Sequence, residues 1–143
     1  MSKYFKEMSL VYEKQIKVTE EHIDQNNHVN NVQYVHWVEE IAAEHWDLLK
    51  HKTEYENDAW MLLDHHIRYK KQVYLDDVIT VKTYPQAPEG AKQPRKVEFY
   101  CHDELVVDSS TLWILFDTET KKIKRLEGNW LEGLAGEIDE NYI

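Results

Sequence analysis

Apolar residues recur at steps of three and four between Asn31 and Lys50, the spacing of one face of an α-helix. The positions are Val32, Val35, Val38, Ile41, Ala42, His45, Trp46 and Leu49. We therefore expect a helix over residues 31–50. Its Ala42–Ala43 pair has small side chains, which would let this face approach a sheet closely.

The remaining chain is patterned mainly as strands, because apolar and polar residues alternate and β-branched and aromatic residues are frequent. The expected strands are 9–19, 59–73, 77–84, 95–102, 105–117 and 122–126. The segment 85–94 holds every proline of the chain and is expected to be a loop, and a tight turn is expected near Asp103. Residues 112–116 are apolar without interruption, which favours a central strand with both faces covered.

One strand, one long helix and a succession of antiparallel strands predict an α+β architecture, in which the helix covers one face of a curved sheet of about five to six strands. We expect a single domain over 1–143, with a Pro-rich loop at 85–94 and a C-terminal tail at 127–143. The second sheet face has no cover within one chain, although the strands at 59–73 and 105–117 put apolar residues on both faces. A homodimer, or a dimer of dimers, would cover it.

Charge and cysteine content narrow the classes of function. The formal charge of the 143 residues is −10, which argues against a general nucleic-acid binder. Local basic clusters could instead meet the phosphates of a coenzyme or an acidic carrier protein. Cys101 is the only cysteine and the longest apolar run has five residues, so we expect a cytoplasmic protein with no intrachain disulfide and no membrane span.

Candidate chemistry is concentrated in residues 24–34 (DQNNHVNNVQY), immediately before and within the start of the expected helix. This segment combines a carboxylate, an imidazole and a run of side-chain amides, and a helix N-terminus stabilises negative charge. Such a combination suits hydrolysis of an ester or thioester. The alternative interpretation is a polar loop with an Asn N-cap.

The spacing D-x-N-x-H-V-N-N-x-x-Y, followed by Trp37 and Glu39, closely resembles the hotdog-fold acyl-ACP thioesterases of plants and bacteria, and more distantly the 4-hydroxybenzoyl-CoA thioesterases. The resemblance implies a hotdog fold and catalytic roles for Asp24, Asn26 and His28. Plant members also use an acidic residue on the following strand, and the matching position in this chain is Gln72, which can orient a water but cannot accept its proton. Where the distant relatives have Gly, this chain has Asn27, which also tolerates a left-handed conformation.

We assign Asp24 as general base or nucleophile, His28 to proton transfer or carbonyl polarisation, and Asn26 to orienting its partner or the water. Backbone N–H groups near Asn30 and Asn31 could hold the oxyanion, while the side chains of these two residues cap the helix. Tyr34 is expected to pack in the core, with lining of a pocket as its second role. Glu39 is expected to be a surface carboxylate, or else a supporting acid.

Other candidate sites and functions have less support from the residues. His65–His66 and Cys101–His102 are adjacent pairs on expected strands, so their side chains should point to opposite faces and form neither a metal site nor a dyad. We expect no metal and no cofactor. The expected activity is hydrolysis of acyl-CoA or acyl-ACP. The alternatives are a dehydratase or hydratase of the same fold, whose Gly- and Pro-containing signature is missing, and a non-catalytic acyl-binding or regulatory module.

Overall fold

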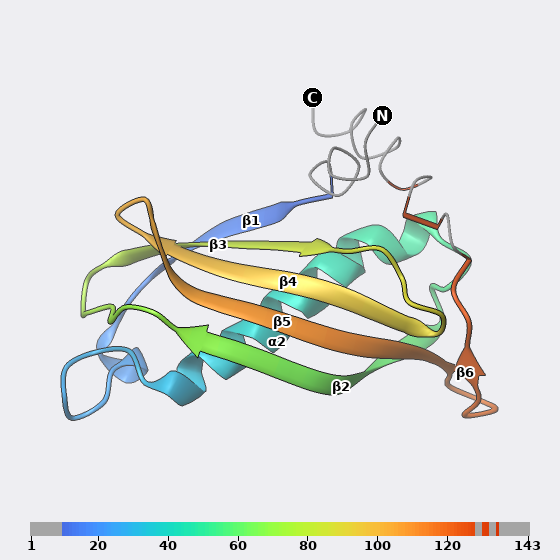
Figure 1. Cartoon of the computed structure of the whole chain (residues 1–143), viewed down its shortest axis with the longest axis horizontal. Coiled ribbons are helices and arrows are strands. Elements are labelled where there is room, and N and C mark those ends of the chain that lie inside the picture. Colours follow the sequence, from blue (N-terminus) through green and yellow to red (C-terminus); the bar gives the residue numbers. More distant parts are fainter. Residues whose placement is uncertain (1–9, 128–129, 132–133, 135–143) are drawn as a thin grey trace.

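One long helix lies across one face of an antiparallel sheet in the computed structural model, which describes residues 10–127, 130, 131 and 134 (Figure 1). The elements are β1 (Tyr12–Lys17), η1 (Glu20–His22), α2 (Asn31–Leu49), η2 (Lys50–Lys52), β2 (Asp58–Tyr69), β3 (Val78–Pro85), β4 (Lys92–Cys101), β5 (Glu104–Asp117) and β6 (Ile123–Lys124). Five of the six strands are ordered β1-β3-β4-β5-β2, and the short β6 pairs with β5. The predicted α+β architecture is confirmed.

Helix α2 begins where its sequence supplies a cap. Asn30 has an extended backbone, and its Oδ1 accepts a hydrogen bond from the N–H of Val32 at 2.8 Å, which satisfies one of the free donors of the first turn. Seven residues of the helix are buried: Tyr34, Trp37, Val38, Ile41, Ala42, His45 and Leu49. Val32, the first member of the expected apolar face, is instead 60% exposed.

The main core lies between this helix face and the middle strands. Trp37 and Ile41 of α2 belong to the same buried cluster as Val97 and Phe99 of β4. Strands β3 and β4 alternate between buried and partly exposed residues, which points one side of each toward the helix. Strand β5 has neighbours on both sides and buries the adjacent Ile114 and Leu115, so the predicted central position of residues 112–116 is confirmed.

Two predicted boundaries are wrong. Strand β2 ends at Tyr69 rather than at residue 73, and residues 70–77 form a connection instead. Strand β4 begins at Lys92, inside the expected loop 85–94, and includes Pro94. The Pro94 carbonyl accepts from the N–H of Gln86, just past the end of β3, so the missing N–H of the proline falls where the β3 ladder has already ended.

The turn expected near Asp103 is confirmed. His102 and Asp103 have φ of 53° and 64° and join Cys101 of β4 to Glu104 of β5. Two consecutive residues with positive φ are typical of the type I′ turn, whose twist matches that of the flanking strands.

The expected tail at 127–143 lies largely outside the described residues. Within it, Leu131 and Leu134 are buried with Leu10 and Leu49, near the C-terminal end of α2. No helix in the described part of the chain is both long enough and apolar enough to cross a membrane.

Candidate active site

The loop before α2 folds back on itself and brings Asp24 and His28 together. The Asp24 carbonyl accepts from the N–H of Asn27 at 3.0 Å, and the Asp24 N–H donates to the His28 carbonyl at 3.0 Å. The reversal needs a left-handed residue, and Asn27 supplies it with φ 66°. The expectation that Asn27 can take the conformation of a glycine is confirmed.

The two side chains are neighbours but do not hydrogen-bond to each other. Asp24 Oδ1 accepts from the Asn26 N–H at 2.8 Å, whereas Oδ2 lies 3.6 Å from His28 Nδ1. Each side chain is 25% exposed. His28 Nδ1 is itself buried and has no hydrogen-bond partner among the described residues. One carboxylate oxygen is therefore fixed by a backbone N–H, and the other faces a buried imidazole nitrogen.

Segments on either side hold this loop in place. The Val29 N–H donates to the Val73 carbonyl at 2.8 Å, and His28 forms a β-bridge with Tyr74. The Asn30 N–H donates to the His22 carbonyl at 3.0 Å. Gln72 is exposed and directly precedes Val73, so the backbone of Gln72 lies close to the loop.

Among the backbone N–H groups at the start of α2, which were expected to bind the oxyanion, most already donate to other protein groups. The N–H groups of Val32 and Gln33 are both used by Asn30, through its side chain and its carbonyl, and that of Asn30 is used by His22. The Asn31 N–H has no partner in the described part of the chain. The structure thus narrows the candidate donors to Asn31 and gives Asn30 the capping role.

Tyr69 also belongs to this region, which the residue pattern did not predict. Its hydroxyl donates to the Asn31 carbonyl at 3.2 Å, and its ring lies 5.8 Å from that of Tyr34. Burial raises the pKa of the Tyr69 hydroxyl, which keeps it a donor. Its contact with Asn31 could be predicted only if the end of β2 were already known to lie beside the start of α2.

Tyr34 packs in the core, as expected for its primary role. It is 2% exposed, with ring centroids 5.5 Å from Trp37 and 5.1 Å from Phe99 in edge-to-face arrangements. Its hydroxyl is buried without a hydrogen-bond partner among the described residues, and burial raises its pKa. Tyr34 does not line the cavity described next.

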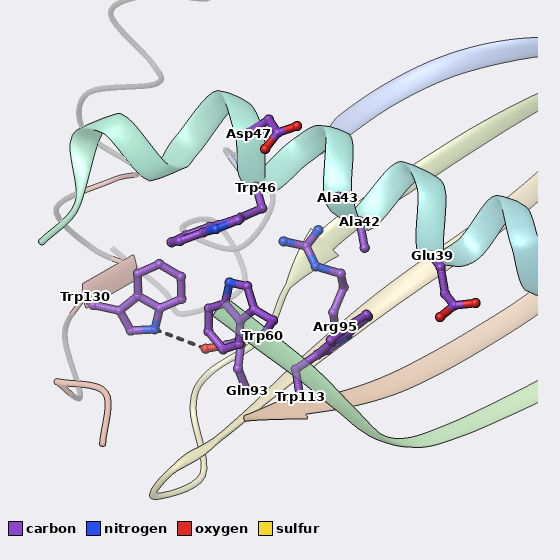
Figure 2. Close-up of a pocket in the computed structure, with 10 residues that line it drawn as sticks. All are labelled: Glu39, Ala42, Ala43, Trp46, Asp47, Trp60, Gln93, Arg95, Trp113 and Trp130. Atoms are coloured by element: carbon purple, nitrogen blue, oxygen red, sulfur yellow. Dashed lines mark hydrogen bonds between the residues drawn. The ribbon is translucent and has the colours of Figure 1, made fainter. Parts of the chain in front are cut away.

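A cavity of about 200 Å³ opens beside the C-terminal half of α2 (Figure 2). It is lined by Glu39, Ala42, Ala43, Trp46, Asp47, Trp60, Gln93, Arg95, Trp113 and Trp130. Of the predicted site residues only Glu39 lies here. Asn31 and Ala42 are eleven helical residues apart, about 16 Å along the axis. The Asp24 loop and the cavity of the same chain are therefore separate places.

The side chains of His65 and His66 point to different surroundings, as expected, whereas those of Cys101 and His102 do not. His65 Nε2 bonds with Ser109 Oγ at 2.8 Å while His66 Nε2 accepts from Arg68 Nε, so these neighbours do have separate surroundings. His102, however, lies in the turn rather than on a strand. The expectation that it points away from Cys101 is wrong.

The turn brings His102 and Cys101 together with Asp77, so that one ligand atom of each lies within 4.8 Å of the others. Asp77 Oδ2 already accepts from the Tyr74 N–H at 3.0 Å. Burial raises the pKa of the Cys101 thiol, with smaller contributions from Asp77 and Glu104. A protonated thiol is a weak nucleophile, so the raised pKa disfavours a nucleophilic role for Cys101.

The single long helix across a curved antiparallel sheet is the hotdog fold. Residues 9–134 match the family described as acyl-ACP thioesterase N-terminal domain. The chain belongs to that family, and by class it is a thioester hydrolase.

Individual relatives agree with this assignment. The long-chain acyl-CoA thioesterase FadM of Escherichia coli K12 is 28% identical over 127 residues, which cover 84% of this chain and 94% of FadM. The crystal structure of YbaW, a probable thioesterase from Escherichia coli, has a TM-score of 0.73 at 27% identity, over 86% of this chain and 96% of that one. An acyl-ACP thioesterase from Bacteroides thetaiotaomicron shares the fold with a TM-score of 0.74 at 17% identity, over 90% of this chain and 52% of that one.

Proposed function

We propose that this protein hydrolyses acyl thioesters of coenzyme A or of acyl carrier protein to the free acid and the thiol, with Asp24, His28 and Asn26 as its catalytic residues. The observation that carries the proposal is the pairing of Asp24 Oδ2 with His28 Nδ1 at 3.6 Å beside the start of α2. The family match and the name of the FadM relative support the substrate class.

Two routes are open for the first step. As a general base, Asp24 takes a proton from a water whose oxygen attacks the thioester carbon. As a nucleophile, its carboxylate oxygen attacks directly, and the resulting anhydride is then hydrolysed by water. In both routes the C–S bond breaks and the departing sulfur needs a proton, which His28 can supply. The N–H of Asn31 is the candidate donor to the oxyanion, and such a donor is worth about 10²–10³ in rate.

Asn26 has one contact that fits its proposed role. Its backbone N–H holds Asp24 Oδ1 at 2.8 Å, which turns the other carboxylate oxygen toward His28. The Asn26 side chain is exposed and available to a water or a thioester carbonyl.

Positive charge next to the loop suits either thiol carrier. Arg68 and Lys70 are exposed at the end of β2, where the chain turns toward Gln72 and the loop. Coenzyme A presents phosphates, and a carrier protein presents an acidic face, so both would be attracted here. Gln72 is proposed to orient a water rather than to accept its proton.

A homodimer or dimer of dimers in the cytoplasm is part of the proposal. Strand β2 is the last strand in the sheet order, and its outward-facing Met61 and Leu63 are 48% and 45% exposed. A long edge strand with apolar side chains is a ready surface for a second copy. The presence of one cysteine only is compatible with a reducing compartment.

The test is release of free thiol from short, long and aromatic acyl-CoAs, and then from acyl-ACP, by wild type and Asp24→Asn. Asp103→Asn serves as a control, because it removes a carboxylate from an exposed turn with positive φ. We expect turnover to collapse in Asp24→Asn alone, with an unchanged melting temperature. Equal turnover in both variants would reject Asp24, and no turnover in wild type on any thioester would favour a non-catalytic acyl-binding module.

A further inference from the structure

A buried arginine forms part of the cavity wall beside the C-terminal half of α2. Arg95 of β4 is only 8% exposed. Its Nη1 donates to Thr83 Oγ1 at 2.9 Å and to His45 Nδ1 at 2.9 Å. Both partners are neutral groups, because burial, and then the Arg95 charge, lowers the pKa of His45 to about 2. The guanidinium therefore has no counter-ion among the residues that the structure describes.

The carboxylates near the cavity do not neutralise Arg95. None of the ion pairs among the described residues includes it. Asp47 is exposed and pairs with Lys50 at 3.2 Å, and the Glu39 carboxylate lies away from the guanidinium (Figure 2). Burying a charge without a partner is unfavourable, so an unpaired arginine at a cavity indicates that an anion enters from outside.

The polar groups of Trp113, Trp130 and Gln93 in the wall are already engaged. Trp113 Nε1 donates to Thr111 Oγ1 at 2.8 Å, and Trp130 Nε1 donates to Gln93 Oε1 at 3.1 Å. Gln93 Nε2 donates to backbone carbonyls. The Arg95 side chain donates to Thr83 and His45 through Nη1, and within the described part of the chain this leaves Nε and Nη2 for a ligand. The apolar part of the wall consists of Ala42, Ala43 and the indole surface of four tryptophans, Trp46, Trp60, Trp113 and Trp130.

We propose that this cavity binds an apolar organic acid, with the carboxylate on Arg95 and the apolar body against the four tryptophans. A guanidinium holds a carboxylate through two parallel N–H donors, and indole rings provide large apolar contacts. The site is separate from the Asp24 loop of the same chain and does not depend on the proposed activity. Two sources have this chemistry, namely a free acid released by thioester hydrolysis and the distal carboxylate of an acyl group.

The distribution of the five tryptophans provides a direct test. Four line the cavity, whereas Trp37 lies in the core and does not. Titration of the ¹⁵N-labelled protein with octanoate should shift the four cavity indole N–H signals and leave that of Trp37 in place. Octan-1-ol has the same chain length without the charge, and should bind about 10- to 100-fold more weakly, the difference made by a charge-assisted hydrogen bond.

Arg95→Met should remove the preference for octanoate, and Arg125→Met, which removes an exposed arginine, should keep it. Equal binding of octanoate and octan-1-ol by wild type would overturn the proposal, as would octanoate shifts that persist in folded Arg95→Met. If Arg95→Met does not fold, the comparison of octanoate with octan-1-ol on the wild-type protein still tests the proposal.

Steady-state hydrolysis separates the two sources. An Arg95-dependent preference for suberoyl-CoA over octanoyl-CoA would assign the cavity to the distal carboxylate of a substrate. Octanoate binding without that preference would assign it to the free acid. This comparison is made only after the binding test, so inactivity on every thioester would reject the proposed function and leave the carboxylate site standing.

Discussion

The carboxylate of Asp24 and the imidazole of His28 lie 3.6 Å apart, held by the backbone that joins them rather than by a hydrogen bond between them. The carboxylate orientation comes from the Asn26 N–H, and His28 is anchored through its bridge to Tyr74. Either side chain can therefore be changed without removing what positions the other, so their contributions can be measured separately.

His28→Gln should lower kcat by about 10²–10⁴-fold, the usual contribution of a general acid–base group. The fold should persist, because the His28 ring is partly exposed and the loop is held by its backbone. Thiol release and thermal melting measured side by side test both statements. His36→Gln, an exposed change on α2, is the control, and equal activity of the two variants would remove His28 from the mechanism.

Asn27→Ala should destabilise the protein by roughly 1–2 kcal/mol, since a Cβ in the left-handed region is strained without the local hydrogen bonding of Asn. Asn27→Gly should be close to neutral at the same φ of 66°. Urea unfolding of both variants measures the difference, with Gln25→Ala as an exposed neighbour for comparison. A Gly variant as unstable as the Ala variant would show that the Asn27 side chain, not its backbone, holds the turn.

Tyr34→Phe should raise the free energy of unfolding by about 1 kcal/mol, because it removes a buried hydroxyl that has no partner among the described residues. Turnover should not change if Tyr34 only packs. Tyr100→Phe, which removes a hydroxyl that donates to Glu98 at 3.1 Å, should not stabilise. A loss of turnover in Tyr34→Phe at full stability would instead give that hydroxyl a part in the reaction.

His45 should make stability sensitive to acid. Burial, and then Arg95, lowers its pKa in the folded protein from 6.5 to about 2, so between these values the unfolded chain binds a proton that the folded protein does not. Stability is then lost as pH falls below about 6.5, by up to about 1.4 kcal/mol per pH unit from this one group.

Denaturant unfolding at pH 6.5, 5.5 and 4.5 measures this loss. His45→Gln should show a shallower decline than wild type, and the exposed change His36→Gln should follow the wild-type slope. Parallel slopes for wild type and His45→Gln would mean that His45 is protonated in the folded protein.

The parts of the molecule that rest on local sequence were predictable. The helix over 31–50 follows from its periodicity and from the cap at Asn30, whereas the catalytic roles suggested by the spacing of Asp24, Asn26 and His28 stay a prediction. The end of β2 was missed because the alternating pattern continues past Tyr69 into residues that bind the loop before α2 instead of a neighbouring strand. The start of β4 was missed because Pro94 favours a loop in the sequence pattern. Its missing N–H costs the sheet no hydrogen bond, since β3 has already ended at that position.

The cavity could not be predicted, for a different reason. Trp46, Trp60 and Trp113 come from α2, β2 and β5, and Arg95 comes from β4. Each of these residues is consistent with ordinary packing in its own element. Only the strand order and the crossing of the helix bring them together, and neither is encoded at the level of local spacing.

The strand order also constrains how the chain can fold as it is synthesised. Strands β1 and β2, which flank the helix in sequence, lie at opposite ends of the order β1-β3-β4-β5-β2, and each pairs only with a strand made later. Residues 12–69 therefore contain no strand pair of their own, whereas β3, β4 and β5 can pair as consecutive hairpins. We expect the meander of β3, β4 and β5 to form first, because its hairpins are local, and β1 and β2, which flank the segment carrying Asp24 and His28, to pair with it afterwards.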